Sequence, residues 1–355
     1  MIHPIAYSRA DSVDDADRQL SSPGAAPLGG GTDLVVSIRE HIARPETLVD
    51  LTRIPDARAV TTTEDGGLRI GGAARLNDLA RHDLVRRRFP MLAEACESVG
   101  TPALRTMGTI AGNLCQRPRC WYLRSGFSCH KSGGDTCPAV AGENQYHAIF
   151  GGGPCYIVHP SDVAVALTAL EAVVEVRGGS GAQPNGAVAG DSEAPGRASS
   201  STETTGVRHV PIDQFYLLPS ERLDAETVLA PGEYVSAIEV PGASAGGVQF
   251  YEKVMQRAGW DFALVSLAAV KRRDGEVRLV LGGVAPKPWR VSESVEEDVA
   301  SGGLGEDDIA TLAERAMYDA RPLSKNGYKV EVAGAVLRRG IERIVLGGER
   351  PADRG

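Results

Sequence analysis

The chain has 355 residues, of which 42% are hydrophobic, so it is long enough for two or three domains with buried cores. Its net charge of −8 argues against nucleic-acid binding, and no apolar run approaches the ~20 residues needed to span a bilayer. Because residues 1–20 lack the pattern of a secretory signal, we predict a cytoplasmic protein, or one that reaches the periplasm only with a signal-bearing partner.

The N-terminal part alternates strands and helices. The expected elements are, in chain order, a strand around 5–7, a helix over 12–20, a strand over 46–51, a hairpin over 58–72 and helices over 76–82 and 89–99. The hairpin is expected because the alternating pattern turns at Glu64-Asp65-Gly66-Gly67.

The middle of the chain continues this mixed pattern. We predict strands over 147–151, 155–161, 172–178 and 233–241, and a helix over 162–172. Residues 178–206 are rich in Gly, Ser, Pro and Thr and poor in bulky apolar side chains. Such a segment cannot bury enough surface to offset its ordering entropy, so we expect a flexible loop there.

A second domain is expected from residue 246. Strands over 247–254, 262–272 and 276–284 precede helices over 306–319 and 331–345, and an Asp274-Gly275 turn joins the last two strands. This order predicts a sheet backed by helices, and the chain as a whole is expected to be an α+β protein.

Two segments of small residues are candidates for binding a ligand through the backbone. Leu28 to Leu34 reads LGGGTDL, and its glycines allow several N–H groups to converge on an anion, with a hydroxyl from Thr32. It matches neither the Rossmann pattern nor a P-loop, and a tight strand-to-helix turn would use the same glycines. Thr106 to Asn113 is a second segment of this kind, so the pair could hold a diphosphate.

Five of the six cysteines lie between Cys115 and Cys155. Thiolates at this density usually hold a metal, and an all-cysteine site suits zinc or an iron–sulfur cluster. Disulfides are a weaker interpretation because nothing in the sequence exports the chain by itself. At a zinc site His130 could replace one thiolate. The sixth, Cys96, is expected to be a small core residue on a helix.

The order of four motifs resembles a known family. They are LGGGTDL, GTIAGN at 108–113, HPSD at 159–162, and a K-x-x-x-R-x-x-x-D-x-A pattern that starts at Lys253. Nearly the whole chain resembles the flavin-binding subunits of the xanthine dehydrogenase/molybdenum hydroxylase family. The cysteine-bearing insertion is similar to those of 4-hydroxybenzoyl-CoA reductase and of the periplasmic aldehyde oxidoreductases, whose flavin subunits carry a 4Fe–4S cluster. The run QRPRCWYL…NQYHAIFGG…CYIVHPSD is closer to the aldehyde oxidoreductases.

The resemblance implies a fold with two parts. The first, residues 1–245, would be an FAD-binding domain of the PCMH/vanillyl-alcohol-oxidase type, with subdomains of about 1–55 and 56–245 and an iron–sulfur insertion at about 114–156. The second, residues 246–355, would be similar to the C-terminal domain of carbon monoxide dehydrogenase flavoproteins, an antiparallel sheet backed by helices.

The resemblance also implies roles for individual residues. FAD would be bound by Leu28, Gly29, Gly30, Gly31, Thr32, Asp33, Leu34, Thr109, Gly112, Asn113, Asp162, Val235 and Lys253. A 4Fe–4S cluster would be held by Cys120, Cys129, Cys137 and Cys155. Because four ligands are enough, Cys115 would not be a ligand. Asp162 would bind the sugar or ribityl part of FAD, and Val235 would line the adenine or isoalloxazine pocket by its backbone. The alternatives are a helix N-cap at Asp162 and an exposed strand position at Lys253. Ala111, where many members have glycine, is small enough to keep the loop geometry.

The function implied is electron transfer within a molybdenum-cofactor oxidoreductase that oxidises aldehydes. A molybdenum-bearing large subunit and a small 2Fe–2S subunit would be the partners, with electrons passing through FAD to a terminal acceptor. Nucleic acid and membrane are not expected as partners, and no residue stands out as a catalytic base or nucleophile. Three alternatives remain: a hydroxybenzoyl-CoA-reductase-like flavin subunit, a self-sufficient flavin oxidase, and a zinc-stabilised module without redox activity.

Overall fold

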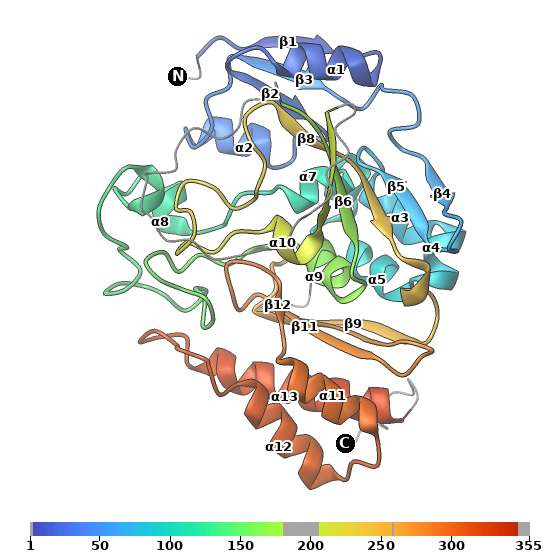
Figure 1. Ribbon diagram of the computed structural model, residues 1–355. Coiled ribbons are helices and arrows are strands. Elements are labelled where there is room, and N and C mark those ends of the chain that lie inside the picture. Colours follow the sequence, from blue (N-terminus) through green and yellow to red (C-terminus); the bar gives the residue numbers. More distant parts are fainter. Residues whose placement is uncertain (1–2, 180–205, 258, 347–355) are drawn as a thin grey trace, which may run out of the picture.

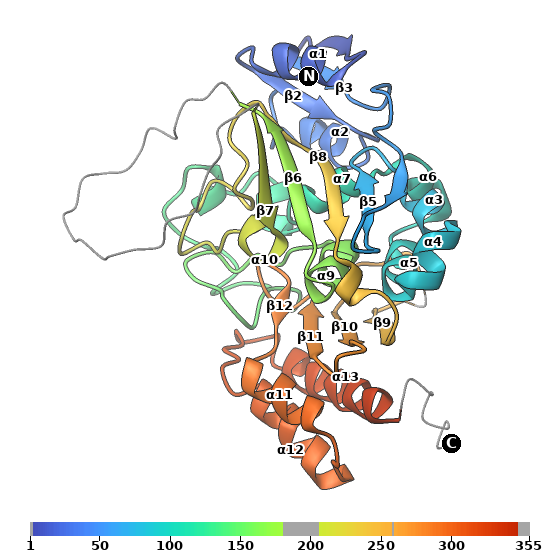
Figure 2. The ribbon, with the colours of Figure 1, turned by 45° about the vertical axis from the view of Figure 1, so that its right-hand side comes forward.

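Three sheets organise the computed structural model, which describes residues 3–179, 206–257 and 259–346. In Figure 1 and Figure 2 the N-terminal strands lie at the top of the molecule, the second sheet in the middle and the C-terminal helices at the bottom. Among the helices of these residues, none has the length and apolar character needed to cross a membrane.

The first sheet is small and parallel, with the strand order β1-β3-β2. Its elements are β1 (Ala6–Arg9), α1 (Val13–Leu20), β2 (Ala25–Leu28), α2 (Leu34–Arg39) and β3 (Thr47–Asp50). Ser12 begins α1, because its side chain accepts a hydrogen bond from the backbone N–H of Asp15. Leu20 and Val49 belong to a small core that Tyr234, from the second sheet, completes. The strands and the helix predicted here are confirmed.

The second sheet has five antiparallel strands in the order β4-β5-β8-β6-β7. They are β4 (Val60–Thr62), β5 (Leu68–Gly71), β6 (Val173–Gly178), β7 (Val207–Pro211) and β8 (Glu233–Val240). The helices connected to them are α3 (Leu76–Arg81), α4 (Asp83–Arg88), α5 (Pro90–Ser98), α6 (Pro102–Met107), α7 (Ile110–Leu114), α8 (Trp121–Arg124), α9 (Asp162–Ala169) and α10 (Ile212–Phe215). The predicted hairpin is confirmed, since β4 pairs with β5 and Gly66 turns with a φ of 81°.

Helix α9 lies between the second and third sheets, and all of its residues are buried. Its side chains are mostly apolar on every face, as expected for a helix covered on all sides. They share one core with Val174 and Ile238 of the second sheet and with Ala268 and Val280 of the third. This helix therefore fixes the third sheet against the rest of the molecule.

The third sheet is antiparallel, with the order β12-β11-β10-β9. Its elements are η2 (Gly242–Ser244), β9 (Val248–Val254), β10 (Val265–Lys271), β11 (Val277–Gly282), β12 (Trp289–Arg290), α11 (Glu293–Ser301), α12 (Glu306–Ala316) and α13 (Tyr328–Val345). Successive residues of β10 alternate between two cores: Leu267 and Ala269 pack with the C-terminal helices, Ala268 and Val270 with α9. The predicted antiparallel sheet backed by helices is thus confirmed.

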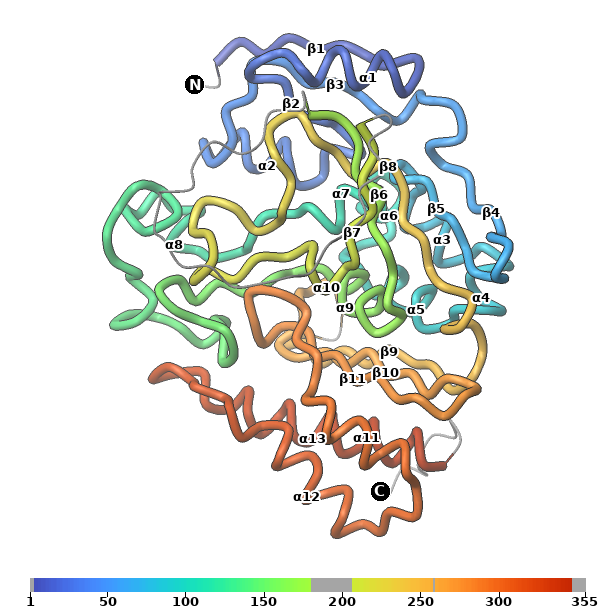
Figure 3. Tube along the Cα trace, viewed as in Figure 1, coloured from blue at the N-terminus to red at the C-terminus, as the bar shows by residue number. Residues whose placement is uncertain are grey.

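The insertion between α7 and α9 has little regular structure beyond α8 and η1 (His130–Ser132). Figure 3 shows it running from α7 to one side of the molecule and returning to α9. The strands predicted over 147–151 and 155–161 are wrong. The backbone N–H groups of Ile149 and Phe150 both donate to Val284 O, so no regular ladder forms. Of the loop predicted over 178–206, residues 180–205 lie outside the described residues.

Candidate functional site

The glycine loop, Leu28 to Leu34, runs from the last residue of β2 to the first of α2 and touches the loop between α6 and α7. A Cβ atom on Gly30 would lie 1.8 Å from the carbonyl oxygen of Met107, and one on Gly29 would lie 2.6 Å from Thr109 Oγ1. Real Cβ atoms do not approach other atoms so closely, so these positions require glycine. The glycines therefore serve the close contact of two loops as well as the strand-to-helix turn.

The two loops differ in their backbone donors. In the described part of the chain, the N–H groups of Gly29 to Thr32 donate to no protein acceptor. In the second loop, the N–H of Ile110 donates to Ala74 O at 2.9 Å, and that of Ala111 to Gly72 O at 3.0 Å. Successive N–H groups without protein acceptors form a nest for an anion. The first loop is thus the anion-binding candidate, and the second forms a wall beside it.

A cavity of about 320 Å³ opens between these loops and the second sheet. Gly29, Thr109, Gly112 and Val235, four of the residues that the resemblance assigns to FAD, line it. Cys115 also lines this cavity and not the smaller cavity that the other insertion cysteines share. Its thiol is buried, and burial raises its pKa to about 12. The structure therefore separates Cys115 from the cysteine cluster.

A second cavity, of about 310 Å³, lies between the insertion, the start of α9 and the third sheet, and its lining includes Asp162 and His147. Helix α7 connects the two cavities. Its Gly112 lines the first, and Asn113 Oδ1 accepts a hydrogen bond of 2.5 Å from Ser161 Oγ, in the lining of the second. Two cavities that adjoin one short helix fit a long ligand with two different ends.

Asp162 and Lys253 form a buried ion pair at the second cavity, with 2.8 Å between Oδ2 and Nζ. Tyr251 donates its hydroxyl to the other carboxylate oxygen at 2.6 Å. Burial raises the pKa of Asp162, and the Lys253 ammonium opposes that rise. Two alternatives are wrong: Lys253 is not exposed, and the N-cap of α9 is Ser161, whose Oγ accepts from the N–H of Ala164. Each carboxylate oxygen keeps a lone pair for a further donor.

Asp33, which the resemblance assigns to FAD, directs its carboxylate to the insertion. It accepts a hydrogen bond from the backbone N–H of Arg117 at 2.8 Å, and it forms ion pairs with Arg119 at 2.8 Å and with Arg124 at 3.3 Å. Arg124 also pairs with Glu40 on the loop after α2 at 2.6 Å. These contacts connect the glycine loop with the residues around Cys120. The arginines near this cysteine were a signal in the sequence that we did not use.

Four cysteines surround one small cavity, whose other walls include Tyr122, Leu123 and Ile157. Backbone N–H groups of Leu123 and Tyr122 hydrogen-bond to one of these sulfurs, and that of Ile157 to another. Burial raises the pKa of the latter thiol to about 11, so this sulfur keeps its proton at neutral pH when no metal is bound. A bound metal replaces such protons. The four cysteines are Cys120, Cys129, Cys137 and Cys155.

His147 approaches the cysteine cluster from the second cavity. Its Nε2 lies 3.4 Å from Cys120 Sγ, and both residues line the second cavity. Burial, followed by the charge of Lys329, lowers the pKa of His147 to about 4. His147 is not among the site residues predicted from the sequence. His130, the histidine predicted as a possible zinc ligand, lines the cysteine cavity, but within the described residues its side chain makes no hydrogen bond to a sulfur.

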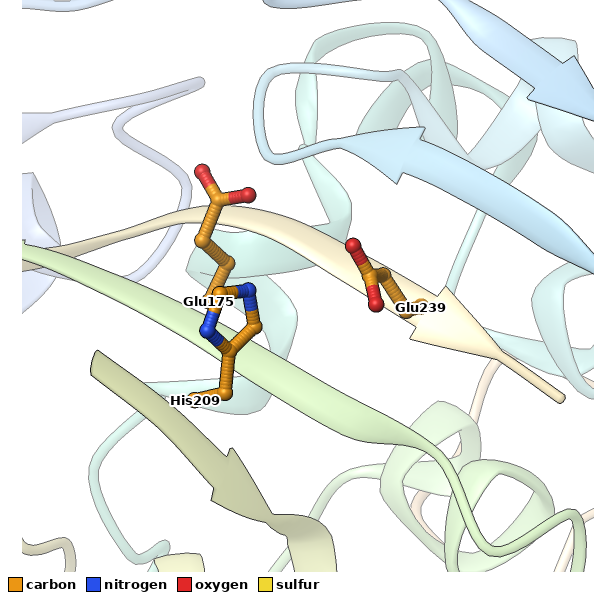
Figure 4. A group of neighbouring side chains, drawn as sticks. All are labelled: Glu175, His209 and Glu239. Carbon is orange, nitrogen blue, oxygen red and sulfur yellow. The ribbon is translucent and has the colours of Figure 1, made fainter. Parts of the chain in front are cut away.

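Glu175, His209 and Glu239 form a separate group on β6, β7 and β8 (Figure 4). One ligand atom from each lies within 4.8 Å of the others, as at a metal site. Arg69, however, donates to both oxygens of Glu175, at 2.8 and 3.0 Å, and Ser236 donates to the same carboxylate at 2.6 Å. The guanidinium already neutralises this carboxylate, so the group is an ion-pair cluster that stabilises the sheet.

Comparison with known proteins identifies relatives over nearly the full length. Residues 3–185 match the family described as "FAD binding domain in molybdopterin dehydrogenase". The chain is similar to the aldehyde oxidoreductase FAD-binding subunit PaoB of Escherichia coli (strain K12), with 35% identity over 94% of this chain and 96% of the relative. It is also similar to the carbon monoxide dehydrogenase medium chain of Hydrogenophaga pseudoflava, with 26% identity over 96% of this chain and 97% of the relative.

Solved structures show the same fold. A carbon monoxide dehydrogenase chain from Hydrogenophaga pseudoflava superposes with a TM-score of 0.68 at 24% identity, covering 96% of this chain and 97% of that one. A chain of quinoline 2-oxidoreductase from Pseudomonas putida 86 gives a TM-score of 0.70 at 19% identity, covering 98% and 99%. These likenesses confirm the predicted fold class.

Proposed function

The chain belongs to the family of FAD-binding subunits of molybdenum hydroxylases, and we propose that it carries FAD and a 4Fe–4S cluster in a complex that oxidises aldehydes. One observation carries the electron-transfer part of this proposal. Cys120 lines the cysteine cavity and also the second large cavity, so a cluster and a ligand in that cavity would be neighbours.

FAD fits the first and second cavities and the glycine loop between β2 and α2. The N–H groups of Gly29 to Thr32 would hold the diphosphate, because they are successive donors without acceptors in the described part of the chain. We assign the flavin end to the second cavity, since it adjoins the cysteines, and the adenosine end to the first. When bound, FAD supplies the exchange of electrons, while the protein binds and orients it. Asp162 and Asn113 would offer further polar contacts at the junction.

The cysteine cavity fits an iron–sulfur cluster by the chemistry of its donors. Four thiols and no carboxylate line it, which suits a soft metal centre. Donors that point at the sulfurs of Cys120 and Cys155 would stabilise thiolates bound to iron. Tyr122, Leu123 and Ile157 form apolar walls that would keep water away. Zinc remains the alternative metal.

Metal and flavin analysis tests the cofactor part. We expect one FAD and about four irons per chain purified without oxygen, with flavin bands and a broad iron–sulfur absorption in the visible spectrum. Zinc in a one-to-one ratio with protein, and no iron, would favour the zinc-stabilised module. Flavin without any metal would contradict the cluster and leave a self-sufficient flavin oxidase as the better interpretation.

The partners are proposed from the relatives. The similar proteins are named as a subunit or a medium chain, which supports a complex with a molybdenum-bearing large subunit and a small 2Fe–2S subunit. The aldehyde oxidoreductase relative, at 35% identity, favours an aldehyde over the hydroxybenzoyl-CoA alternative. We expect aldehyde oxidation only after co-expression with both partners. Turnover of an aldehyde by the chain alone, at about 1 s⁻¹ or more, would contradict the subunit assignment.

A further inference from the structure

We propose that His147 sets the reduction potential of the cysteine-bound cluster by donating its Nε2–H to the sulfur of Cys120. This inference rests on the proposed function, because it requires a redox-active cluster on the four cysteines. The distance of 3.4 Å between Nε2 and Sγ is within hydrogen-bonding range for sulfur. His147 is only 4% exposed, so water does not compete for this contact.

Cys120 receives more hydrogen-bond donors than Cys155 does. Besides His147, the backbone N–H groups of Leu123 and Tyr122 hydrogen-bond to its sulfur, whereas the sulfur of Cys155 receives the N–H of Ile157. Reduction of a cluster adds negative charge, which spreads onto the thiolate sulfurs. Each N–H donor stabilises that charge and so raises the reduction potential.

Among the described residues, Ser132 is the other side chain that hydrogen-bonds to one of the four cluster sulfurs, with Oγ 3.4 Å from Cys129 Sγ. A serine hydroxyl has one hydrogen, and Phe127 O accepts it at the shorter distance of 2.8 Å. His147 has no such competing acceptor at Nε2 among the described residues. Because a thiolate only accepts, the proton of a neutral imidazole must be on Nε2 for this contact.

The C-terminal domain holds His147 in place. The backbone oxygen of His147 accepts hydrogen bonds from Asn326 Nδ2 at 3.0 Å and from Lys329 Nζ at 3.2 Å. Lys329 is 1% exposed and also donates to Tyr146 O at 3.0 Å and to Gly283 O at 2.7 Å. Three carbonyl acceptors around one buried amine fix the loop that carries the imidazole. Asn326 and Lys329 are thus positioning residues for His147.

The location of His147 gives this contact a functional meaning. The imidazole and the cysteine that it contacts both line the second cavity, which we assign to the flavin end of FAD. A donor at this place tunes the cluster on the side that faces the flavin. Its loss would lower the potential of the cluster without removing any ligand.

Two substitutions of His147 and one control test the proposal in the full chain purified without oxygen. His147→Phe removes the donor and keeps a ring, while His147→Gln keeps an N–H donor. His130→Phe is the control, because His130 lines the cysteine cavity without a hydrogen bond to sulfur within the described residues. The measurements are iron content, and the potential of the cluster from a redox titration followed by electron paramagnetic resonance.

We expect all three variants to keep their iron. His147→Phe should shift the one-electron equilibrium about tenfold towards the oxidised cluster, which corresponds to a potential about 59 mV lower. The potential of the His147→Gln variant should fall by less, and that of the His130→Phe variant should equal the wild-type potential. An unchanged potential in His147→Phe with full iron would overturn the inference. Loss of iron from both His147 variants, with iron kept in His130→Phe, would overturn it in favour of a ligand role.

A measurement on the wild-type sequence covers the case in which a variant does not fold. In protein labelled with ¹⁵N-histidine, pulsed electron paramagnetic resonance of the reduced cluster should detect one weakly coupled histidine nitrogen. No coupling would contradict the hydrogen bond, and strong coupling would indicate direct ligation and contradict it as well. Absence of iron from the wild type would overturn the proposed cluster itself, whereas full iron without coupling would overturn only the role of His147.

Discussion

The glycine loop and the cysteine insertion form the two halves of the site, and they are built in opposite ways. The glycine loop is short, lies between a strand and a helix, and depends on the absence of side chains at Gly29 and Gly30. The insertion has little regular structure and depends on side chains from distant parts of the chain. Glu226, for example, pairs with Arg117 at 2.8 Å and with Lys131 at 2.7 Å.

This difference indicates where each half is vulnerable. The glycine loop cannot accept even a Cβ atom at Gly30, because the backbone of Met107 already occupies that space. The insertion fails when a ligand or a distant partner is removed, because side chains from outside it, such as Glu226 and Asp33, hold it in place. Asp33 joins the two halves, since it belongs to the loop and binds arginines of the insertion. Changes in each half should therefore be separable, except at Asp33.

The largest effect is expected in the insertion. Alanine at Cys120, Cys129, Cys137 or Cys155 should remove essentially all iron, because each would remove one of four ligands. Cys115→Ala should keep the iron, since its sulfur lines the first large cavity. Iron and flavin contents of the purified variants provide the measurement. Iron kept in Cys155→Ala and lost in Cys115→Ala would reverse the assignment of ligands.

The next largest effect is expected in the glycine loop. Gly30→Ala places a Cβ atom 1.8 Å from Met107 O, so the two loops must separate. Overpacking of this kind costs ~1–3 kcal/mol, so FAD affinity should fall about 10- to 100-fold. Titration of the apoprotein with FAD measures the change. Gly327→Ala is the control, because a Cβ atom there meets nothing within 4 Å. Equal FAD affinity in both variants would contradict the role of the loop.

An intermediate effect is expected where the halves join. Asp33→Asn removes the charge that faces Arg119 and Arg124, whose side chains are 28% and 11% exposed. Losing a partly buried, charge-assisted network should lower the free energy of unfolding by about 2 kcal/mol, as measured by denaturant titration. The control is Asp224→Asn, which breaks an exposed pair with Arg222 and should change stability by less than about 0.5 kcal/mol. Similar changes in the two variants would show that Asp33 does not join the halves.

The smallest effect is expected outside both halves. Arg177 pairs with Val207 across β6 and β7, so a short loop could join the two strands directly. Replacing residues 180–205 with Asn-Gly should leave both FAD and iron contents unchanged. Loss of flavin from this variant would show that the replaced segment takes part in cofactor binding.

Much of the fold could be predicted because its signals are local. The apolar spacing over 162–172 predicted α9, and the alternation over 58–72 predicted the hairpin of β4 and β5. The strands predicted over 147–151 and 155–161 failed for a physical reason. Their apolar residues are buried, as at Ile149 and Ile157, but their N–H groups find scattered partners. A run of apolar residues indicates that a segment is buried. A buried segment forms a strand only when its backbone groups also pair with a neighbouring strand.

The sequence by itself determined the types of chemistry: glycines that allow backbone to approach a ligand, and cysteines dense enough to hold a soft metal. The tertiary structure alone decided which groups meet. It separates Cys115 from the four cysteines that share the cysteine cavity, brings His147 to Cys120 across 27 residues, and brings Asp33 to Arg117 across 84. The physical reason is that backbone conformation depends on neighbouring residues, whereas contacts between distant side chains depend on how sheets and helices pack.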